Sequence, residues 1–182
     1  MLNPPAPYHL RELRPSDIDG LMVIERAVFP TPWKASAYEY EISRNRLAHY
    51  QALLAQVADR PQQLIGYAGT WTLVDELHIS TIAVDKAWQG KGLGELLLLN
   101  LLTLAYAWPV TMVTLEVRRG NMTAQSLYNK YRFEVVGKRR RYYEGKEDAL
   151  IMTVAALDAP YRVYLKQCQR ALYGRLAANK VS

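Results

Sequence analysis

The chain has 182 residues, a length that fits one domain with a short extension. Half of its residues are hydrophobic, enough for a buried core, and 22% are charged, as in an ordinary soluble protein. One cysteine, Cys168, excludes an internal disulfide and a cysteine metal cluster, and His9, His49 and His78 lack metal-ligand spacing. We therefore expect no metal site, and a reducing, cytoplasmic setting.

The net charge of +6 is unevenly distributed. One basic run covers Lys138–Arg141, and the tail is basic as well, with Asp158 alone against Arg162, Lys166, Arg170, Arg175 and Lys180. Such clusters favour an anionic partner, either a nucleic acid, a ribosome or a phosphorylated cofactor, but a solvated face is equally compatible with them. No membrane partner is expected, because the first seven residues lack the pattern of a signal peptide and the longest apolar stretch, 96–108, is too short to span a bilayer.

The first half of the chain alternates between strand and helix signals. We expect a strand over 8–13, a helix capped by Ser16 that ends at Phe29, and a second helix over 35–44. Three strands follow, over 49–57, 64–73 and 76–84, with a turn at Asp59-Arg60-Pro61 between the first two. Their short connections predict an antiparallel meander.

The second half continues with a long apolar helix to about Trp108, a strand over 113–117, a helix over 121–131, and a closing hairpin over 134–141 and 149–155. This order predicts an α+β domain over 1–157, with a mixed, mostly antiparallel sheet of about seven strands and flanking helices. A basic C-terminal helical extension is expected over 158–182. One face of that helix should be apolar, with Tyr161, Leu165, Cys168, Leu172 and Leu176.

A glycine-rich segment, Gln89–Gly94, lies between a predicted strand and a predicted helix. Its glycines let several backbone N–H groups approach one point, and the following helix adds the positive end of its dipole. This arrangement favours a phosphate or a pyrophosphate. It lacks the features of a P-loop and the Rossmann spacing, so by itself the segment is also compatible with a purely structural turn.

The residues around this loop resemble the GNAT superfamily of N-acetyltransferases. Thr81–Asp85, Gln89–Gly94 and Leu96-Leu97 are similar to its acetyl-CoA signature, in which Gln/Arg-x-x-Gly-x-Gly/Ala begins a helix. The second half of the superfamily is matched by Leu115–Arg118, Asn121, Ala124, Ser126–Tyr128 and Tyr131–Phe133. The match departs at Arg132, because the family usually has Leu-Gly-Phe where this chain has Tyr131-Arg132-Phe133.

Narrower features resemble the RimI type within that superfamily, the bacterial ribosomal-protein-alanine N-acetyltransferases. They are Glu25-Arg26, Phe29–Trp33, Arg141–Tyr143 and Glu147–Met152. The similarity runs from about Tyr8 to Ala155, so the tail lies outside it. The resemblance implies the GNAT fold and acetyl-CoA as the donor substrate.

The resemblance also implies where acetyl-CoA binds. The pantetheine arm would lie between the strands of 81–84 and 113–117, which splay apart in the family, with a Val84 N–H as a candidate oxyanion donor. The residues implied to bind the cofactor are Ile82, Ala83, Val84, Gln89, Gly90, Lys91, Gly92, Leu93, Gly94 and Asn121. Asn121 is equally compatible with an ordinary helix N-cap.

Two residues are implied to be catalytic, Glu116 and Tyr128. Glu116 stands in an apolar strand, where a carboxylate needs a reason, and would accept the proton of the acceptor ammonium through water. Tyr128 would protonate the departing thiolate. Without the resemblance, a solvent-facing glutamate and a core tyrosine are the plainer interpretations. Direct attack in a ternary complex is expected, because Cys168 in the tail is not placed as a nucleophile.

For the acceptor, we expect aromatic walls from two loops. The candidate substrate-binding residues are Glu25, Phe29, Pro30, Trp33, Tyr142 and Tyr143. Aromatic rings with hydroxyl groups suit the first residues of a flexible peptide, whereas an internal lysine would need a more open groove. We therefore favour a protein N-terminus as the acceptor, while an internal lysine stays open as an alternative.

The resemblance makes acetylation of the N-terminal alanine of the eighteenth small-subunit ribosomal protein the leading hypothesis. A broader N-terminal protein acetyltransferase, as found in archaea, a small-amine acetyltransferase and a non-catalytic acyl-CoA- or RNA-binding module stay open as alternatives. The basic tail is a candidate for contact with ribosomal RNA.

Overall fold

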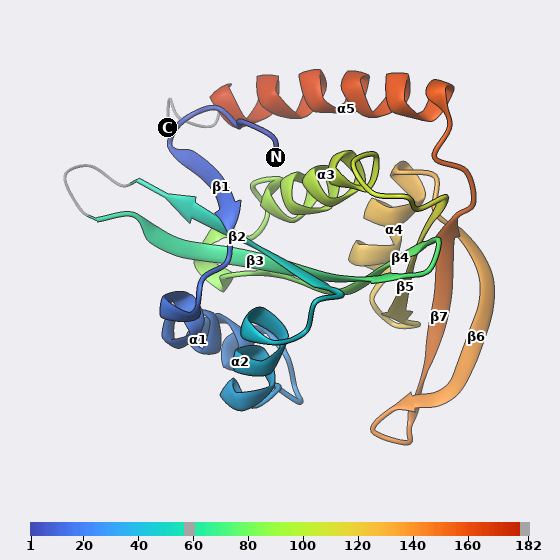
Figure 1. The fold of residues 1–182 in the computed structure, drawn as a ribbon, viewed down its shortest axis with the longest axis horizontal. Helices are drawn as coiled ribbons and strands as arrows, with labels where there is room; N and C mark the ends of the chain where they lie inside the picture. Colours follow the sequence, from blue (N-terminus) through green and yellow to red (C-terminus); the bar gives the residue numbers. More distant parts are fainter. Residues whose placement is uncertain (57–60, 179–182) are drawn as a thin grey trace.

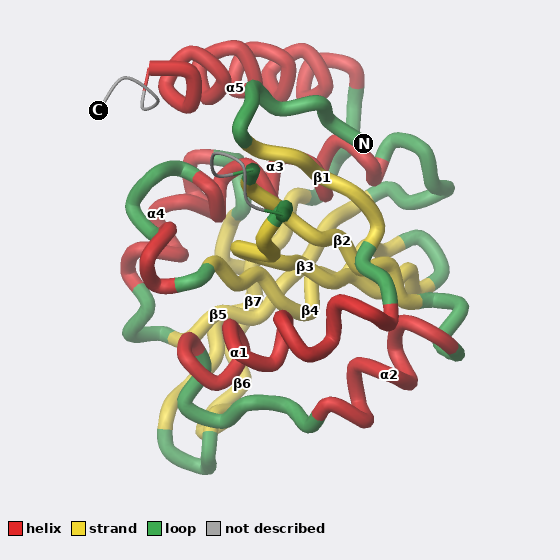
Figure 2. Tube along the Cα trace, turned by 90° about the vertical axis from the view of Figure 1, so that its left-hand side faces the viewer, coloured by secondary structure: helices red, strands yellow, loops and turns green. Residues whose placement is uncertain are grey.

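The computed structural model describes residues 1–56 and 61–178, and within them a seven-stranded sheet has helices on both faces (Figures 1 and 2). The elements are β1 (Tyr8–Glu12), α1 (Ile18–Val28), α2 (Ala35–Ser43), β2 (Ala48–Ala55), β3 (Gln63–Leu73), β4 (Glu76–Val84), α3 (Leu93–Ala105), β5 (Met112–Arg118), α4 (Met122–Lys130), β6 (Glu134–Tyr143), β7 (Glu147–Val154) and α5 (Ala159–Ala178). The strand order is β1-β2-β3-β4-β5-β7-β6. All neighbours pair antiparallel except β4 and β5, which are parallel. The predicted α+β, mostly antiparallel fold is confirmed.

The sheet separates two apolar cores. Along β2, Leu53 and Ala55 face one core while Ala52 and Leu54 face the other, because side chains alternate along a strand. Helices α1 and α2 cover one face, and α3 covers the opposite face together with α5 (Figure 2). α3 is buried on nearly every side because the sheet lies beneath it and α5 crosses its outer side.

The predicted apolar face of the tail helix is confirmed. Tyr161, Leu165, Cys168, Leu172 and Leu176 are buried in the same core as α3. α5 therefore packs on the body of the protein along its length (Figure 1). The boundary at residue 157 between a domain and an extension stays a prediction, and Lys180 lies outside the described residues.

The prediction that Ser16 caps the first helix is wrong. Ser16 lies inside a 3-10 turn over Pro15–Asp17, and Asp17 occupies the N-cap position of α1. The Asp17 carboxylate accepts hydrogen bonds from the Arg14 backbone N–H at 2.7 Å and from the Arg11 guanidinium at 2.6 and 2.7 Å. Ser16 is therefore not the N-cap, because it already lies within the 3-10 turn that leads into α1 and that the Asp17 carboxylate closes on the Arg14 N–H.

Two other predicted boundaries concern the strands. β6 continues beyond the predicted end at Arg141 to Tyr143, across an irregularity where Arg141 has a φ of 51° and its N–H donates to Asp148 at 2.8 Å. The predicted end of the second strand at Val57 and the turn residues Asp59 and Arg60 lie outside the described residues.

Strands β4 and β5 are paired over only part of their length. Their parallel register joins Glu76–Ile79 to Met112–Leu115, and beyond it β4 pairs with β3 alone and β5 with β7 alone within the described residues. A bulge in β4 falls at Ser80, which has no opposite residue in β3, where the two strands begin to separate. The edges of Ser80–Val84 and Glu116–Arg118 are therefore free to accept another extended chain.

Candidate active site

The separation of β4 from β5 creates a place for a ligand with backbone-like amides. An extended chain of amides can add to an open strand edge through main-chain hydrogen bonds. The pantetheine arm of acetyl-CoA has this chemistry, and Ile82, Ala83 and Val84 lie on the open segment of β4. These residues fit the role that the sequence predicts for them, which stays a prediction.

The glycine loop between β4 and α3 has the geometry of an anion site. Gly90 and Gly92 have φ values of 77° and 83°, in the left-handed region, and Gly92 is the N-cap of α3. A Cβ added at Gly90 or Gly94 would meet no atom within 4 Å, whereas one added at Gly92 would lie 3.2 Å from Leu172 Cδ1. Two of the glycines therefore face open space and one packs against α5. Open space beside a helix N-terminus fits a pyrophosphate.

The flanks of this loop are tied down by side chains. The Gln89 amide donates a hydrogen bond to the Val84 carbonyl at 3.0 Å, which links the loop to the end of β4. The Lys91 ammonium lies 4.9 Å from the centre of the Trp88 ring, and Leu93 begins α3 with its side chain buried. Lys91 adds a positive charge beside the loop.

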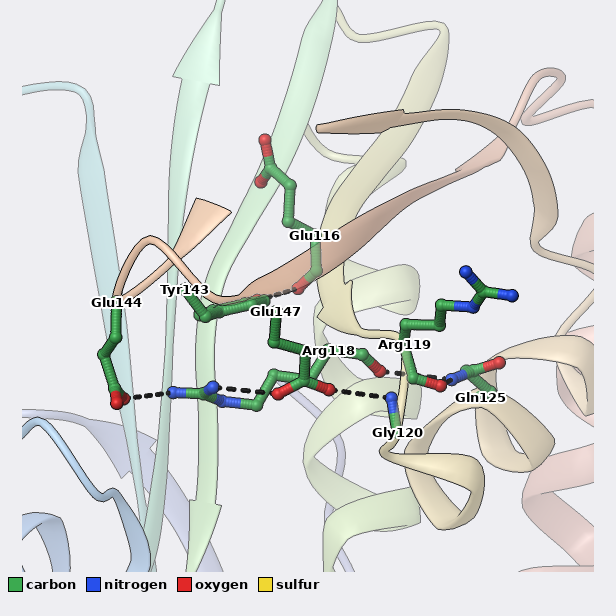
Figure 3. A network of polar contacts seen from close by, with 8 residues as sticks. All are labelled: Glu116, Arg118, Arg119, Gly120, Gln125, Tyr143, Glu144 and Glu147. Atoms are coloured by element: carbon green, nitrogen blue, oxygen red, sulfur yellow. Dashed lines mark hydrogen bonds and ion pairs between the residues drawn. The ribbon is translucent and has the colours of Figure 1, made fainter. Parts of the chain in front are cut away.

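Glu116 on β5 is held by a histidine and an arginine. Its carboxylate lies 3.0 Å from His78 Nε2 and 3.0 Å from a terminal nitrogen of Arg139. The side chain is only 10% exposed, and it points away from the ion-pair cluster of Arg118, Glu144 and Glu147 (Figure 3). The carboxylate therefore lies in the middle of the sheet, beside His78 and Arg139 and apart from the neighbouring ion pairs.

His78 on β4 is given no catalytic role by the sequence analysis, but the structure places it next to Glu116. Its Nδ1 lies 3.0 Å from the Thr114 hydroxyl, which in turn donates to Glu76 at 2.5 Å. Burial disfavours the imidazolium, but the hydrogen bond and charge of Glu116, together with the charge of Glu76, outweigh it and raise the pKa of His78 above its ordinary value. The hydrogen bond from His78 lowers the pKa of Glu116. The two groups form an ion pair that holds one proton.

Tyr128 lies on α4 and packs against Phe133, with ring centres 5.7 Å apart. Burial of the hydroxyl raises the pKa of Tyr128 to about 12. The hydroxyl is therefore protonated at neutral pH and can donate a proton, as the predicted role requires.

Asn121 is the N-cap of α4. Its side-chain carbonyl accepts a hydrogen bond from the Ala124 N–H at 3.1 Å, so its interpretation as a helix cap is confirmed. Contact with the cofactor stays a prediction.

On the acceptor side, Glu25 is buried and anchors the loop between α1 and α2. Its carboxylate accepts hydrogen bonds from the Trp33 backbone N–H at 2.8 Å and from the Tyr67 hydroxyl, and the Tyr67 hydroxyl lies 3.2 Å from that of Tyr38. Phe29 packs against the core under α1, and Pro30 is exposed. Glu25 thus fixes the loop from beneath.

An aromatic stack runs from this loop to His78. The Trp33 and Trp71 rings are nearly parallel, with centres 6.4 Å apart, and Trp71 stacks on the His78 imidazole at 5.6 Å. The Trp71 indole N–H donates to Glu41 at 2.6 Å, which fixes the ring. The loop predicted to contact the acceptor is therefore connected to the histidine that holds Glu116.

The β6–β7 hairpin approaches Glu116 from the other side. The Tyr143 hydroxyl donates to the Glu116 carbonyl at 3.3 Å, and the Arg118 guanidinium lies 4.1 Å from the centre of the Tyr143 ring (Figure 3). Arg118 also binds Glu147, which accepts the Gly120 N–H at 2.8 Å. Tyr142 stays half exposed next to this ring. The end of β6 thus contacts the backbone of Glu116, while its carboxylate contacts His78 and Arg139.

Comparisons with known proteins agree with this geometry. A model of the acetyltransferase (GNAT) family matches residues 18–133. A protein of Bacillus subtilis (strain 168), provisionally named a ribosomal protein bS18-alanine N-acetyltransferase, is 36% identical over 80% of this chain and 93% of its own length. The N-alpha-acetyltransferase RimI of Mycobacterium tuberculosis is 35% identical over 75% of this chain and 85% of its own length.

Among solved structures, the ribosomal-protein-S18-alanine N-acetyltransferase of Escherichia coli superimposes with a TM-score of 0.73 at 28% identity, over 84% of this chain and 96% of that one. Within the part of the chain that the structure describes, no helix has the length and apolarity of a membrane span. Nor do three or more potential metal ligands among His, Cys, Asp and Glu come together there.

Proposed function

The chain belongs to the acetyltransferase (GNAT) family, and from this premise we propose that it acetylates the N-terminal α-amine of a protein, with the N-terminal alanine of ribosomal protein bS18 as its acceptor. It is an acetyl-CoA-dependent N-acetyltransferase. The acceptor is supported by the names of the relatives, which align over most of their own length, by the aromatic stack from Trp33 to His78, and by Tyr142 and Tyr143 at the end of β6.

The observation that carries the proposal is the contact between Glu116 and His78 where β4 and β5 separate. Acetyl-CoA supplies the acetyl thioester. The Glu116–His78 pair accepts the proton that the acceptor ammonium must lose before its nitrogen can attack. Since the pair already holds one proton at low pH, it becomes a proton acceptor as His78 deprotonates.

The remaining groups complete the reaction. As the new C–N bond forms, the Val84 N–H is the candidate hydrogen-bond donor to the carbonyl oxygen. As the C–S bond breaks, the Tyr128 hydroxyl supplies a proton to the leaving sulfur. Backbone N–H groups of Gln89–Gly94 hold the pyrophosphate, and Ile82, Ala83 and Val84 bind the pantetheine arm. Phe29, Pro30, Trp33, Tyr142 and Tyr143 form the walls of the acceptor site.

The test is acetyl transfer from acetyl-CoA to short peptides that differ only in their first residue, read by mass spectrometry. We expect acetylation of the α-amine of Ala-starting peptides and a large loss of rate in Glu116→Gln and Tyr128→Phe. Equal rates on Ala-, Ser- and Met-starting peptides would instead indicate a broader N-terminal acetyltransferase. If no peptide reacts while acetyl-CoA binds, small amines become the candidate acceptors.

We further propose that the enzyme acts in the cytoplasm and that the exposed face of α5 contacts ribosomal RNA. Arg162, Lys166 and Arg170 recur every four residues on this face, all exposed, and α5 contains no acidic residue. Replacing these three by glutamine should weaken ribosome association and flatten its salt dependence. Substitution is preferred to deletion of the helix, since deletion would uncover the core beneath it.

A further inference from the structure

Helix α5 delivers a cation to the first turn of α3. The Arg175 guanidinium lies 2.9 Å from the Glu95 carboxylate, which also accepts hydrogen bonds from the Lys130 ammonium at 2.6 Å and the Tyr131 hydroxyl at 3.0 Å. Burial disfavours the charged form of Glu95, but these hydrogen bonds and the nearby cations outweigh it and hold the pKa of Glu95 below its ordinary value. The carboxylate is therefore ionised and surrounded by cations.

The position of Arg175 is fixed by the packing of α5 on the glycine loop. Leu172 and Leu176 precede and follow it along the helix, and a Cβ added at Gly92 would lie 3.2 Å from Leu172 Cδ1 and 3.9 Å from Leu176 Cδ2. Both leucines are fully buried. The glycine without a side chain thus lets α5 approach the backbone at the N-terminus of α3.

The first half of α5 is tied to the end of α4, which supplies the other partners of Glu95. The Tyr161 hydroxyl donates to the Tyr131 carbonyl at 2.8 Å, and the Tyr164 hydroxyl donates to the Lys130 carbonyl at 2.5 Å. The Arg132 guanidinium lies 4.1 Å from the centre of the Tyr164 ring. Arg132 has a φ of 60°, at the position where the superfamily usually has glycine, so α5 also supports a left-handed residue there.

An ionised glutamate in the first turn of α3 opposes an anion at the same helix end. Glu95 stabilises an empty helix N-terminus, but it would repel a pyrophosphate held by the N–H groups of Gly92 and its neighbours. Lys130 and Arg175 remove that repulsion. Arg175 lies outside residues 18–133, which the family model matches.

We propose that Arg175 is a positioning residue of the acetyl-CoA site, which neutralises Glu95 and so keeps the N-terminus of α3 attractive to the cofactor phosphates. This inference rests on the proposed function, because it takes the glycine loop as the pyrophosphate site. It assigns to α5, beyond its packing, a contribution to cofactor affinity through charge.

The experiment compares Arg175→Gln with Arg46→Gln, a matched loss of one positive charge at an exposed arginine in the turn between α2 and β2, on the side of the sheet opposite α3. The dissociation constant for acetyl-CoA is measured by isothermal titration calorimetry at low and high salt, and the Michaelis constants for acetyl-CoA and for acetyl-pantetheine, which lacks the phosphates, are compared. In Arg175→Gln we expect about three- to tenfold weaker binding of acetyl-CoA, less at high salt, with the acetyl-pantetheine constant unchanged. Arg46→Gln should bind acetyl-CoA as wild type does.

Rescue separates a charge effect from a structural one. Adding Glu95→Gln to Arg175→Gln removes the unpaired carboxylate and should restore the affinity for acetyl-CoA. The inference is overturned if Arg175→Gln matches Arg46→Gln, if acetyl-pantetheine is affected equally, or if the double variant is not restored. If the wild-type protein itself does not bind acetyl-CoA, the assignment of the cofactor site fails, and the inference fails with it.

Discussion

His78 Nε2 lies 3.0 Å from the Glu116 carboxylate across the point where β4 and β5 separate. The parallel register sets this contact, because His78 is opposite Thr114 and Glu116 follows two residues later on the same face of β5. An imidazole beside a carboxylate in the middle of the sheet can hold or release one proton near neutral pH. The pair therefore makes the rate of acetyl transfer depend on pH in a defined direction.

We expect kcat/KM to rise with pH through an apparent pKa above the ordinary value of about 6.5 for histidine. Below that pKa the imidazolium occupies Glu116, and above it the pair can accept the proton of the acceptor. In Glu116→Gln the main partner that raises the pKa of His78 is lost while burial remains. The acidic limb should move to lower pH, with kcat reduced on the order of 100-fold.

The matched control for this pH profile is His49→Asn. His49 is another strand histidine, stacked on Trp108 with ring centres 4.4 Å apart. The substitution of His49 should leave the pH profile of kcat/KM unchanged. In His78→Asn, the rise of kcat/KM with pH above pH 6 should be lost. A profile that is the same in wild type, Glu116→Gln and His78→Asn would contradict a role for the pair in catalysis.

Removal of the Tyr128 hydroxyl should affect the departure of the thiol and leave cofactor binding intact. The raised pKa of Tyr128 keeps its proton available at every pH used in an assay. In Tyr128→Phe we expect kcat to fall on the order of 100-fold with little change in the affinity for acetyl-CoA. The control is Tyr106→Phe, which removes a hydroxyl that donates to the Asp158 carbonyl at 3.0 Å. A normal kcat in Tyr128→Phe would assign the proton to another donor.

Local sequence patterns predict the order of the elements and the buried face of α5, because strand and helix periodicities depend on nearby residues. The prediction that Ser16 caps α1 was wrong, because a 3-10 turn that the Asp17 carboxylate closes on the Arg14 N–H already contains Ser16. Helix propensity predicts that a helix forms here, but it does not fix the first residue, because helix ends often contain a 3-10 turn.

The candidate site is predicted only in part, for a similar reason. Glu116 is visible as a lone carboxylate in an apolar strand, whereas its partner His78 depends on the register between two strands that are separated in sequence by α3. The contact between Arg175 and Glu95 spans 80 residues and depends on how α5 crosses α3. Crossing and register are set by packing of the whole core, so no short motif reports them.

Replacement by alanine should lower the stability of the protein by different amounts at two glycines of the loop, Gly90 and Gly92. Both have a left-handed backbone, so each substitution costs about 1–2 kcal/mol of stability. At Gly92 the new methyl group also meets Leu172, which adds about 1–3 kcal/mol, whereas at Gly90 it points into open space. Urea unfolding should therefore rank Gly92→Ala below Gly90→Ala in stability.

The affinity for acetyl-CoA should depend on Gly90 as well. If the open space beside Gly90 receives the phosphates, the methyl group of Gly90→Ala weakens the binding of acetyl-CoA by more than the loss of stability alone would. Calorimetry on the folded Gly90→Ala protein measures this affinity. Unchanged affinity in that variant would mean that the phosphates lie elsewhere along the loop.

Glu25 offers a choice between two roles, an anchor of the acceptor loop and a group that receives the acceptor amine. Glu25→Gln keeps an oxygen for the Trp33 N–H and an amide for the Tyr67 hydroxyl. Glu25→Ala removes the acceptor of both groups and leaves the Tyr67 hydroxyl only its contact with Tyr38. For an anchor, the alanine variant loses about 2–3 kcal/mol of stability and raises the Michaelis constant of the peptide, while the glutamine variant stays close to wild type. A glutamine variant as impaired as alanine in peptide KM, yet normal in stability, would show that the negative charge itself contacts the amine. Peptide kinetics and urea unfolding measured on the same two proteins therefore decide between the roles, because glutamine keeps the size and one oxygen of Glu25 but removes its negative charge.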